Sequence, residues 1–192
     1  IIRGNLVHTK RVKKQHKKDE FDEREIINGE NILSKCSSTI LNVTGTLSRL
    51  YFSAIMNLVR EDRKKMKKVL HNVEELNQQA KDLKYNIYPT LKKLEEGSVE
   101  TGHYYVQILD YIRETAHCLR FLSDNIFEYL DNNHPPLISE QVKDLHELNE
   151  SVNEFFDDAI RIIKKQHFKN IDKLISQQRA ILDLITRIKK KQ

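Results

Sequence analysis

Residues that interrupt helices are scarce in this sequence. It has 5 glycines and 3 prolines among 192 residues, and it has no tryptophan. Hydrophobic residues make up 39% of the chain and charged residues 32%, a composition that is typical of long helices. No segment alternates between apolar and polar residues for long enough to predict a β-strand. The sequence therefore predicts an all-α protein built around one hydrophobic core.

Long apolar runs are also missing. A helix that crosses a bilayer needs roughly 18–20 mostly apolar residues in a row, and the sequence has no such run. Residues 1–18 are basic and lack the continuous apolar stretch of a secretory signal. The sequence starts with Ile1 instead of methionine, so we expect it to be a piece of a longer protein, which leaves open a membrane portion outside the piece.

Cysteine is rare, with 2 residues that lie far apart in the sequence. Cys36 and Cys118 both fall among apolar helix positions. This pattern predicts two small core residues that stay reduced, with a disulfide between them as the alternative.

Motifs of the common catalytic sites are absent as well. The sequence has no glycine-rich phosphate loop, no nucleophile elbow, no paired-cysteine motif and no H-E-x-x-H. The sequence therefore predicts that the protein is not an enzyme.

Positive charge is concentrated at the two ends of the chain, and the formal net charge is +5. The basic residues of the first segment are Arg3, Lys10, Arg11, Lys13, Lys14, Lys17 and Lys18. Residues 1–26 lack a sustained periodicity and are expected to form a basic linker or arm. No aromatic residues alternate with these cations, which argues against a nucleic-acid partner and leaves an anionic membrane surface or solvent as the surroundings of the arm.

Helical periodicity dominates the rest of the chain, residues 27–192. Apolar residues recur at steps of three and four in five stretches: 27–59, 61–87, 98–132, 139–165 and 167–190. Pro89, Gly97 and the pair Pro135–Pro136 mark the breaks between them. Short breaks make neighbouring helices antiparallel, so we expect one elongated up-and-down antiparallel helical bundle. The connection before residue 167 is either a tight reversal or a bend.

The stretch 98–132 carries two opposite lines of side chains. Its apolar line predicts a buried face and consists of Tyr105, Ile108, Leu109, Ile112, Ala116, Leu119, Ile126 and Leu130. The second line is polar apart from one phenylalanine and consists of His103, Gln107, Asp110, Glu114, His117, Phe121, Asp124 and Glu128.

Asp110, Glu114 and His117 are the candidate metal ligands of this second line. They follow one another at steps of four and three, so two carboxylates and an imidazole lie along one edge of the helix. Iron and other divalent ions accept both ligand types. The alternative is a solvated helix surface, and the same alternative applies to the acidic series Glu150, Glu154 and Asp158. A di-iron centre would need a second Glu-x-x-His pair on a neighbouring helix, which the sequence lacks.

The third stretch and its neighbours resemble a known family. HYYVQILDYIRETAHCLRFLSDNIFEYL, preceded by KKMKKVLHNVEELNQQAKDLKYNI and followed by NNHPPLISEQVKDLHEL, is similar to the PhoU-like cytoplasmic domain of bacterial inorganic phosphate transporters. The resemblance covers roughly residues 60–190. The family's motif, two carboxylates separated by three residues, is matched by Asp110 and Glu114. The Gly-Asp-His segment that often follows the first carboxylate is replaced here by Thr115-Ala116-His117.

The resemblance implies a PhoU-like bundle that regulates phosphate transport without being an enzyme. Its partner would be the membrane-spanning part of a phosphate transporter, on the same polypeptide, with a bound metal at the carboxylate motif. The domain would lie on the cytoplasmic side of the inner membrane, where basic residues such as those of the arm accumulate. The alternative is a structural or scaffolding bundle that self-associates as a homo-oligomer and binds no ligand.

Overall fold

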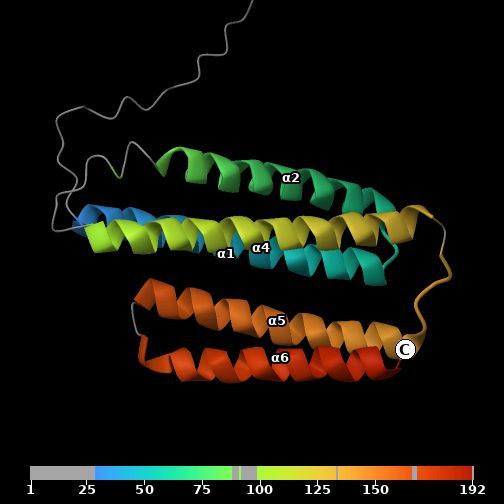
Figure 1. The fold of residues 1–192 in the computed structure, drawn as a ribbon. Helices are drawn as coiled ribbons and strands as arrows, with labels where there is room; N and C mark the ends of the chain where they lie inside the picture. The colour runs from blue at the N-terminus through green and yellow to red at the C-terminus, as the bar shows by residue number, and fades with distance from the viewer. Residues whose placement is uncertain (1–28, 88–90, 92–98, 133, 166–167, 192) are drawn as a thin grey trace, which may run out of the picture.

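The computed structural model describes residues 29–87, 91, 99–132, 134–165 and 168–191 (Figure 1). Within these residues, five α-helices form a bundle with antiparallel contacts: α1 (Gly29–Val59), α2 (Arg63–Tyr85), α4 (Val99–Asp131), α5 (Ser139–Lys165) and α6 (Ile171–Lys191). A short 3₁₀ turn, Phe168–Asn170, leads into α6. The prediction of an all-α antiparallel bundle is confirmed for this part of the chain. The basic arm, Pro89 and Gly97 lie outside the described residues.

A capped reversal joins α1 to α2. Glu61 adopts the left-handed conformation with φ 53°, which turns the chain back on itself. Asp62 then caps α2, because its Oδ1 atom accepts a hydrogen bond of 2.9 Å from the backbone N–H of Lys65. Hydrogen bonds from Lys65 also lower the pKa of the Asp62 carboxyl.

The first three described helices form a three-helix unit, in which each helix packs on the other two. The predicted apolar face of α4 lies in its core, as Leu109, Ala116 and Leu119 are all buried. Asn77 of α2 is buried in the same interface, and its Nδ2 atom donates hydrogen bonds of 3.0 Å to the carbonyl oxygens of Val73 and Ala116. The amide therefore ties α2 directly to the backbone of α4.

The last two helices form a hairpin. Lys173 lies 2.6 Å from Asp158 near the turn, and Lys191 lies 2.8 Å from Asp144 at the open end. These two pairs show that α5 and α6 are antiparallel along their whole length, so the chain reverses direction between them.

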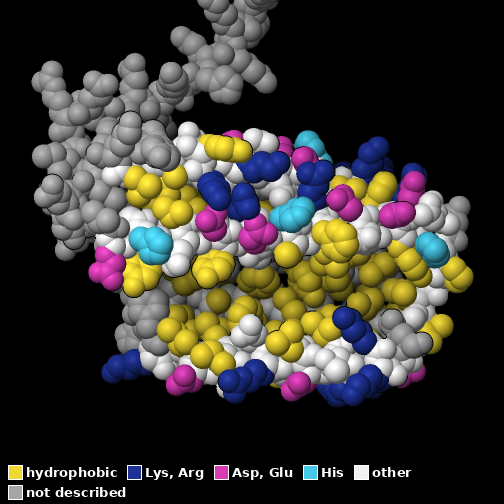
Figure 2. Space-filling model, viewed as in Figure 1, with side chains coloured by type: hydrophobic (Ala, Val, Ile, Leu, Met, Phe, Trp, Pro, Cys, Tyr) yellow, Lys and Arg dark blue, Asp and Glu magenta, His cyan; other side chains and the backbone are white. Residues whose placement is uncertain are grey.

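The hairpin packs against the three-helix unit through α1. Leu145 and Phe156 of α5 reach the hydrophobic core, and Ser48 of α1 donates a hydrogen bond of 3.5 Å to Asn153 of α5. Figure 1 shows α2 at one edge of the molecule, α1 and α4 in the middle and α6 at the other edge. Figure 2 shows a hollow between α4 and the hairpin, lined with hydrophobic side chains.

One sequence-based expectation is wrong. Cys118 is exposed and unpaired, so it is not a core residue. It lies one position before the buried Leu119, and one residue turns a helix by about 100°, enough to carry a side chain out of the core. The side chain of Cys36 lies outside the described part of the structure.

Candidate functional site

The candidate site is a depression between α2 and α4, about 270 Å³ in volume. It contains two of the three predicted metal ligands, Glu114 and His117. The other lining residues are Asn77, Lys81, Lys84, Tyr85 and Arg113. The small residues Ala80 of α2 and Ala116 of α4 are both buried.

The third predicted ligand, Asp110, lies beside this depression and forms an ion pair across the interface. Its Oδ1 atom is 2.5 Å from the Nζ atom of Lys84 on α2. This ion pair neutralises the Asp110 carboxylate with a cation from the neighbouring helix. Lys84 also lines the depression.

Glu114 is also neutralised, by its neighbour in the sequence. The Nη2 atom of Arg113 donates a hydrogen bond of 2.7 Å to the Oε1 atom of Glu114. This bond lowers the pKa of the Glu114 carboxyl and raises that of the Arg113 guanidinium. Glu114 therefore stays ionised with a cation beside it.

These contacts do not fit a metal ion. A metal at Asp110, Glu114 and His117 would have to displace both Lys84 and Arg113 from the carboxylates. Among the residues that the structure describes, no three His, Cys, Asp or Glu side chains are grouped so that they could hold a metal ion. The metal site stays a prediction. A metal ion there would need further carboxylates, whereas the packing of α2 on α4 brings the basic residues Lys81 and Lys84 to this place.

The basic side of the depression was not recognised in the sequence. Asn77, Lys81 and Lys84 lie four and three residues apart, on the edge of α2 that meets α4. The three-and-four spacing was a usable signal. The residues that face this edge come from α4, so the partners became visible only in the folded chain.

The acidic series on α5, Glu150, Glu154 and Asp158, lies in different surroundings. Glu150 and Glu154 are exposed, whereas Asp158 is buried and contacts Lys173 and Arg161. The structure therefore does not bring the two series of carboxylates together as one site.

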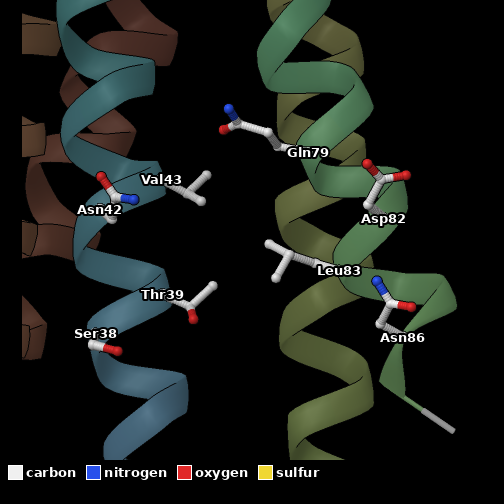
Figure 3. Close-up of a pocket in the computed structure, with 8 residues that line it drawn as sticks. All are labelled: Ser38, Thr39, Asn42, Val43, Gln79, Asp82, Leu83 and Asn86. Atoms are coloured by element: carbon white, nitrogen blue, oxygen red, sulfur yellow. The ribbon is translucent and has the colours of Figure 1, made fainter. Parts of the chain in front are cut away.

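A second depression, of about 530 Å³, lies between α1 and α2. Figure 3 shows its lining: Ser38, Thr39, Asn42 and Val43 from α1, and Gln79, Asp82, Leu83 and Asn86 from α2. Asp82 is its one charged lining residue, and its carboxylate accepts a hydrogen bond of 2.9 Å from Gln78. Hydroxyl and amide groups without a base or nucleophile pair give this depression no evident chemistry.

Comparison with known proteins adds no family to this picture. No protein-family model matches the chain, and no match was found among curated proteins or among solved structures.

Proposed function

We propose that this chain is a non-enzymatic regulatory domain of an inorganic phosphate transporter, positioned on the cytoplasmic side of the membrane. The transporter and the PhoU-like character rest on the sequence resemblance over residues 60–190. The structure supports the regulatory part through one observation: the α5–α6 hairpin makes its substantial contacts with the rest of the bundle through α1.

We take the hairpin as the part of the domain that changes position. The core of the three-helix unit is formed by α1, α2 and α4, and Leu145 and Phe156 of α5 pack against it, so a shift of the hairpin would move the side chains that cover one side of this core. Regulation needs an element with two arrangements whose balance a partner can alter. In the proposal, the transporter alters the position of the hairpin, and the domain in turn restrains transport.

An uptake measurement tests this function. The chain is joined to the cytoplasmic end of an inorganic phosphate transporter in cells that depend on that transporter, and the initial uptake rate of radiolabelled phosphate is measured. We expect the intact chain to lower this rate. The variant L109D, which places a carboxylate in the core, should lose the effect, whereas the exposed variant K67D should keep it. Equal uptake with the intact chain and with L109D would contradict the proposal.

A structural bundle that self-associates and binds no ligand is the second candidate function. The observation in its favour is the set of large hydrophobic side chains that α4 and α6 expose, namely Tyr104, Tyr111, Phe121, Ile171, Ile175 and Leu182. Exposed apolar surface of this kind is typical of an interface between proteins.

A further inference from the structure

Helix α6 carries apolar residues along two sides. One side packs on α5 through Leu174, Ile181, Leu184 and Ile188, which are buried or half-buried. The other side is the outer seam of α6, formed by Ile171, Ile175, Gln178, Leu182, Ile185 and Lys189. Ile175 is 40% exposed and Leu182 is 56% exposed. The outer seam alternates steps of four and three, which is the spacing of a helix that packs against another helix.

The surroundings of the outer seam are apolar as well. Figure 2 shows hydrophobic side chains lining the hollow between α4 and the α5–α6 hairpin. On α4, the side turned away from α2 repeats the same spacing with Tyr104, Ile108, Tyr111, Thr115, Cys118 and Leu122. Tyr111 is 70% exposed. The hollow therefore offers room and apolar contacts to one more helix beside α6.

The charges next to the outer seam indicate which helix that is. Asp172, Arg179, Asp183 and Lys190 form one row along α6, and their charges alternate in sign. None of these four side chains forms an ion pair with another residue of the described chain. On the side that faces α5, by contrast, Lys173, Arg187 and Lys191 all have acidic partners.

This row of charges is complementary to itself when it is reversed. In an antiparallel pair of α6 helices centred on residue 180, Lys190 of the partner subunit lies opposite Asn170, two residues from Asp172, so these opposite charges lie near each other at each end. Arg179 and Asp183 of both copies meet around the two-fold axis as a cluster of alternating charges. In the same register, Ile175 lies opposite Ile185 of the partner subunit, and Gln178 lies opposite Leu182 of the partner subunit. A parallel pair would instead place each charge beside its equal.

We infer that a second copy of this chain occupies the hollow, and that the two α6 helices pair antiparallel through their outer seams. Two hairpins joined in this way form an assembly of four helices, in which the two α6 helices are the antiparallel pair at the interface. The inference deepens the second candidate function, because it names the surface and the register of self-association. It is independent of phosphate transport.

Sedimentation of the full chain tests the pairing. We expect a dimer that R179D weakens, with a dissociation constant raised about tenfold or more, because four carboxylates then surround the two-fold axis. The double variant R179D/D183R restores the alternating cluster and should restore the dimer. L182E should separate the copies, and K67D on α2 is the matched surface control. Circular dichroism confirms that each variant keeps its helices, and Arg179 is exposed, so R179D tests the pairing even if L182E unfolds.

Cysteine cross-linking tests the direction of the pairing. In a background with Cys36 and Cys118 replaced by serine, I175C mixed with I185C should form a disulfide-linked dimer, and neither variant should do so alone. Self-linking of I175C would show a parallel pair and overturn the inference. A monomer at every concentration would overturn it too, as would a dimer that withstands both R179D and L182E. A dimer that withstands both variants would contradict the pairing of the α6 helices but would still agree with the scaffolding function. This outcome distinguishes failure of the pairing from failure of the function.

Discussion

The Oδ2 atom of Asp158 on α5 lies 2.6 Å from the Nζ atom of Lys173 near the start of α6. The same carboxylate contacts Arg161 at 3.0 Å and accepts a hydrogen bond of 3.0 Å from Gln177. Its side chain is only 10% exposed. Asp158 is therefore the polar residue that holds the closed end of the hairpin together.

Replacing this carboxylate should loosen the hairpin. D158N removes the charge that Lys173 and Arg161 face, and we expect it to lower the free energy of unfolding by about 1–2 kcal/mol. The control is D157N, because Asp157 is the exposed neighbour in the sequence. Urea unfolding followed by circular dichroism measures both variants. Equal stability of D158N and D157N would contradict this role.

Acid should weaken the same contact. The hydrogen bond from Lys173 lowers the pKa of the Asp158 carboxyl below its ordinary value of about 4. A lowered pKa in the folded state stabilises the fold fully above the unfolded pKa, and this contribution is lost as the pH falls through the folded pKa. We expect the free energy of unfolding to drop below about pH 4, and to drop less steeply in D158N. Parallel pH profiles for the two proteins would be the contrary result.

Asn77 should matter more than its size suggests. N77A removes the buried hydrogen bonds to the carbonyl oxygens of Val73 and Ala116, and we expect it to cost about 1–2 kcal/mol of stability. N72A on the exposed side of α2 is the matched control and should change stability by less than about 0.5 kcal/mol. Thermal unfolding of the two variants decides whether the α2–α4 bridge is needed.

Two leucines distinguish the core from the outer seam. L109A truncates a side chain that is 1% exposed and should cost about 2–5 kcal/mol, because it leaves a cavity in the hydrophobic core. L182A truncates a side chain that is 56% exposed, so it should change the stability of the monomer by about 0.5 kcal/mol or less. Both are measured at protein concentrations low enough to separate the copies. A large loss in L182A under these conditions would place Leu182 inside the folded monomer.

The carboxylates of α4 can be tested for metal directly. Because Lys84 and Arg113 already neutralise Asp110 and Glu114, we expect D110N/E114Q to contain the same amount of metal as the parent protein. Elemental analysis of the two purified proteins by mass spectrometry makes the comparison, and H103A on the same helix serves as the control for a single lost ligand type. Iron or another divalent ion that disappears in D110N/E114Q alone would show that a metal displaces both cations.

Periodicity was sufficient to predict the helices and their core faces. The predicted helices at 98–132 and 139–165 agree closely with α4 and α5, since apolar spacing and strong breaks define both. Leu109 and Ala116 are buried as expected, because the steps of three and four fix which side of a helix they share. Cys118 was misjudged, because it lies about 200° around the helix from the buried Ala116, so the helical spacing itself turns it away from the core.

The partners of polar residues could not be predicted in this way. The sequence presents Asp110 and Glu114 as a pair of carboxylates, and it presents α5 as an acidic surface. Folding brings Lys84 to Asp110 from another helix, and it covers Asp158 with Lys173 of α6. Each of these contacts joins residues that helical spacing alone does not relate.

The sequence by itself determined that the chain is helical, where most helices begin and end, and which residues form the core, because these features follow from local spacing and from residues that break helices. Only the tertiary structure decided that the fifth helix folds back on the fourth and that the candidate carboxylate ligands face cations. It also decided that α6 keeps an exposed apolar seam, next to a row of alternating charges that have no ion-pair partner among the described residues. The reason is physical: a helix determines the relative positions of its own side chains, whereas charge neutralisation and burial depend on which other helix packs against it.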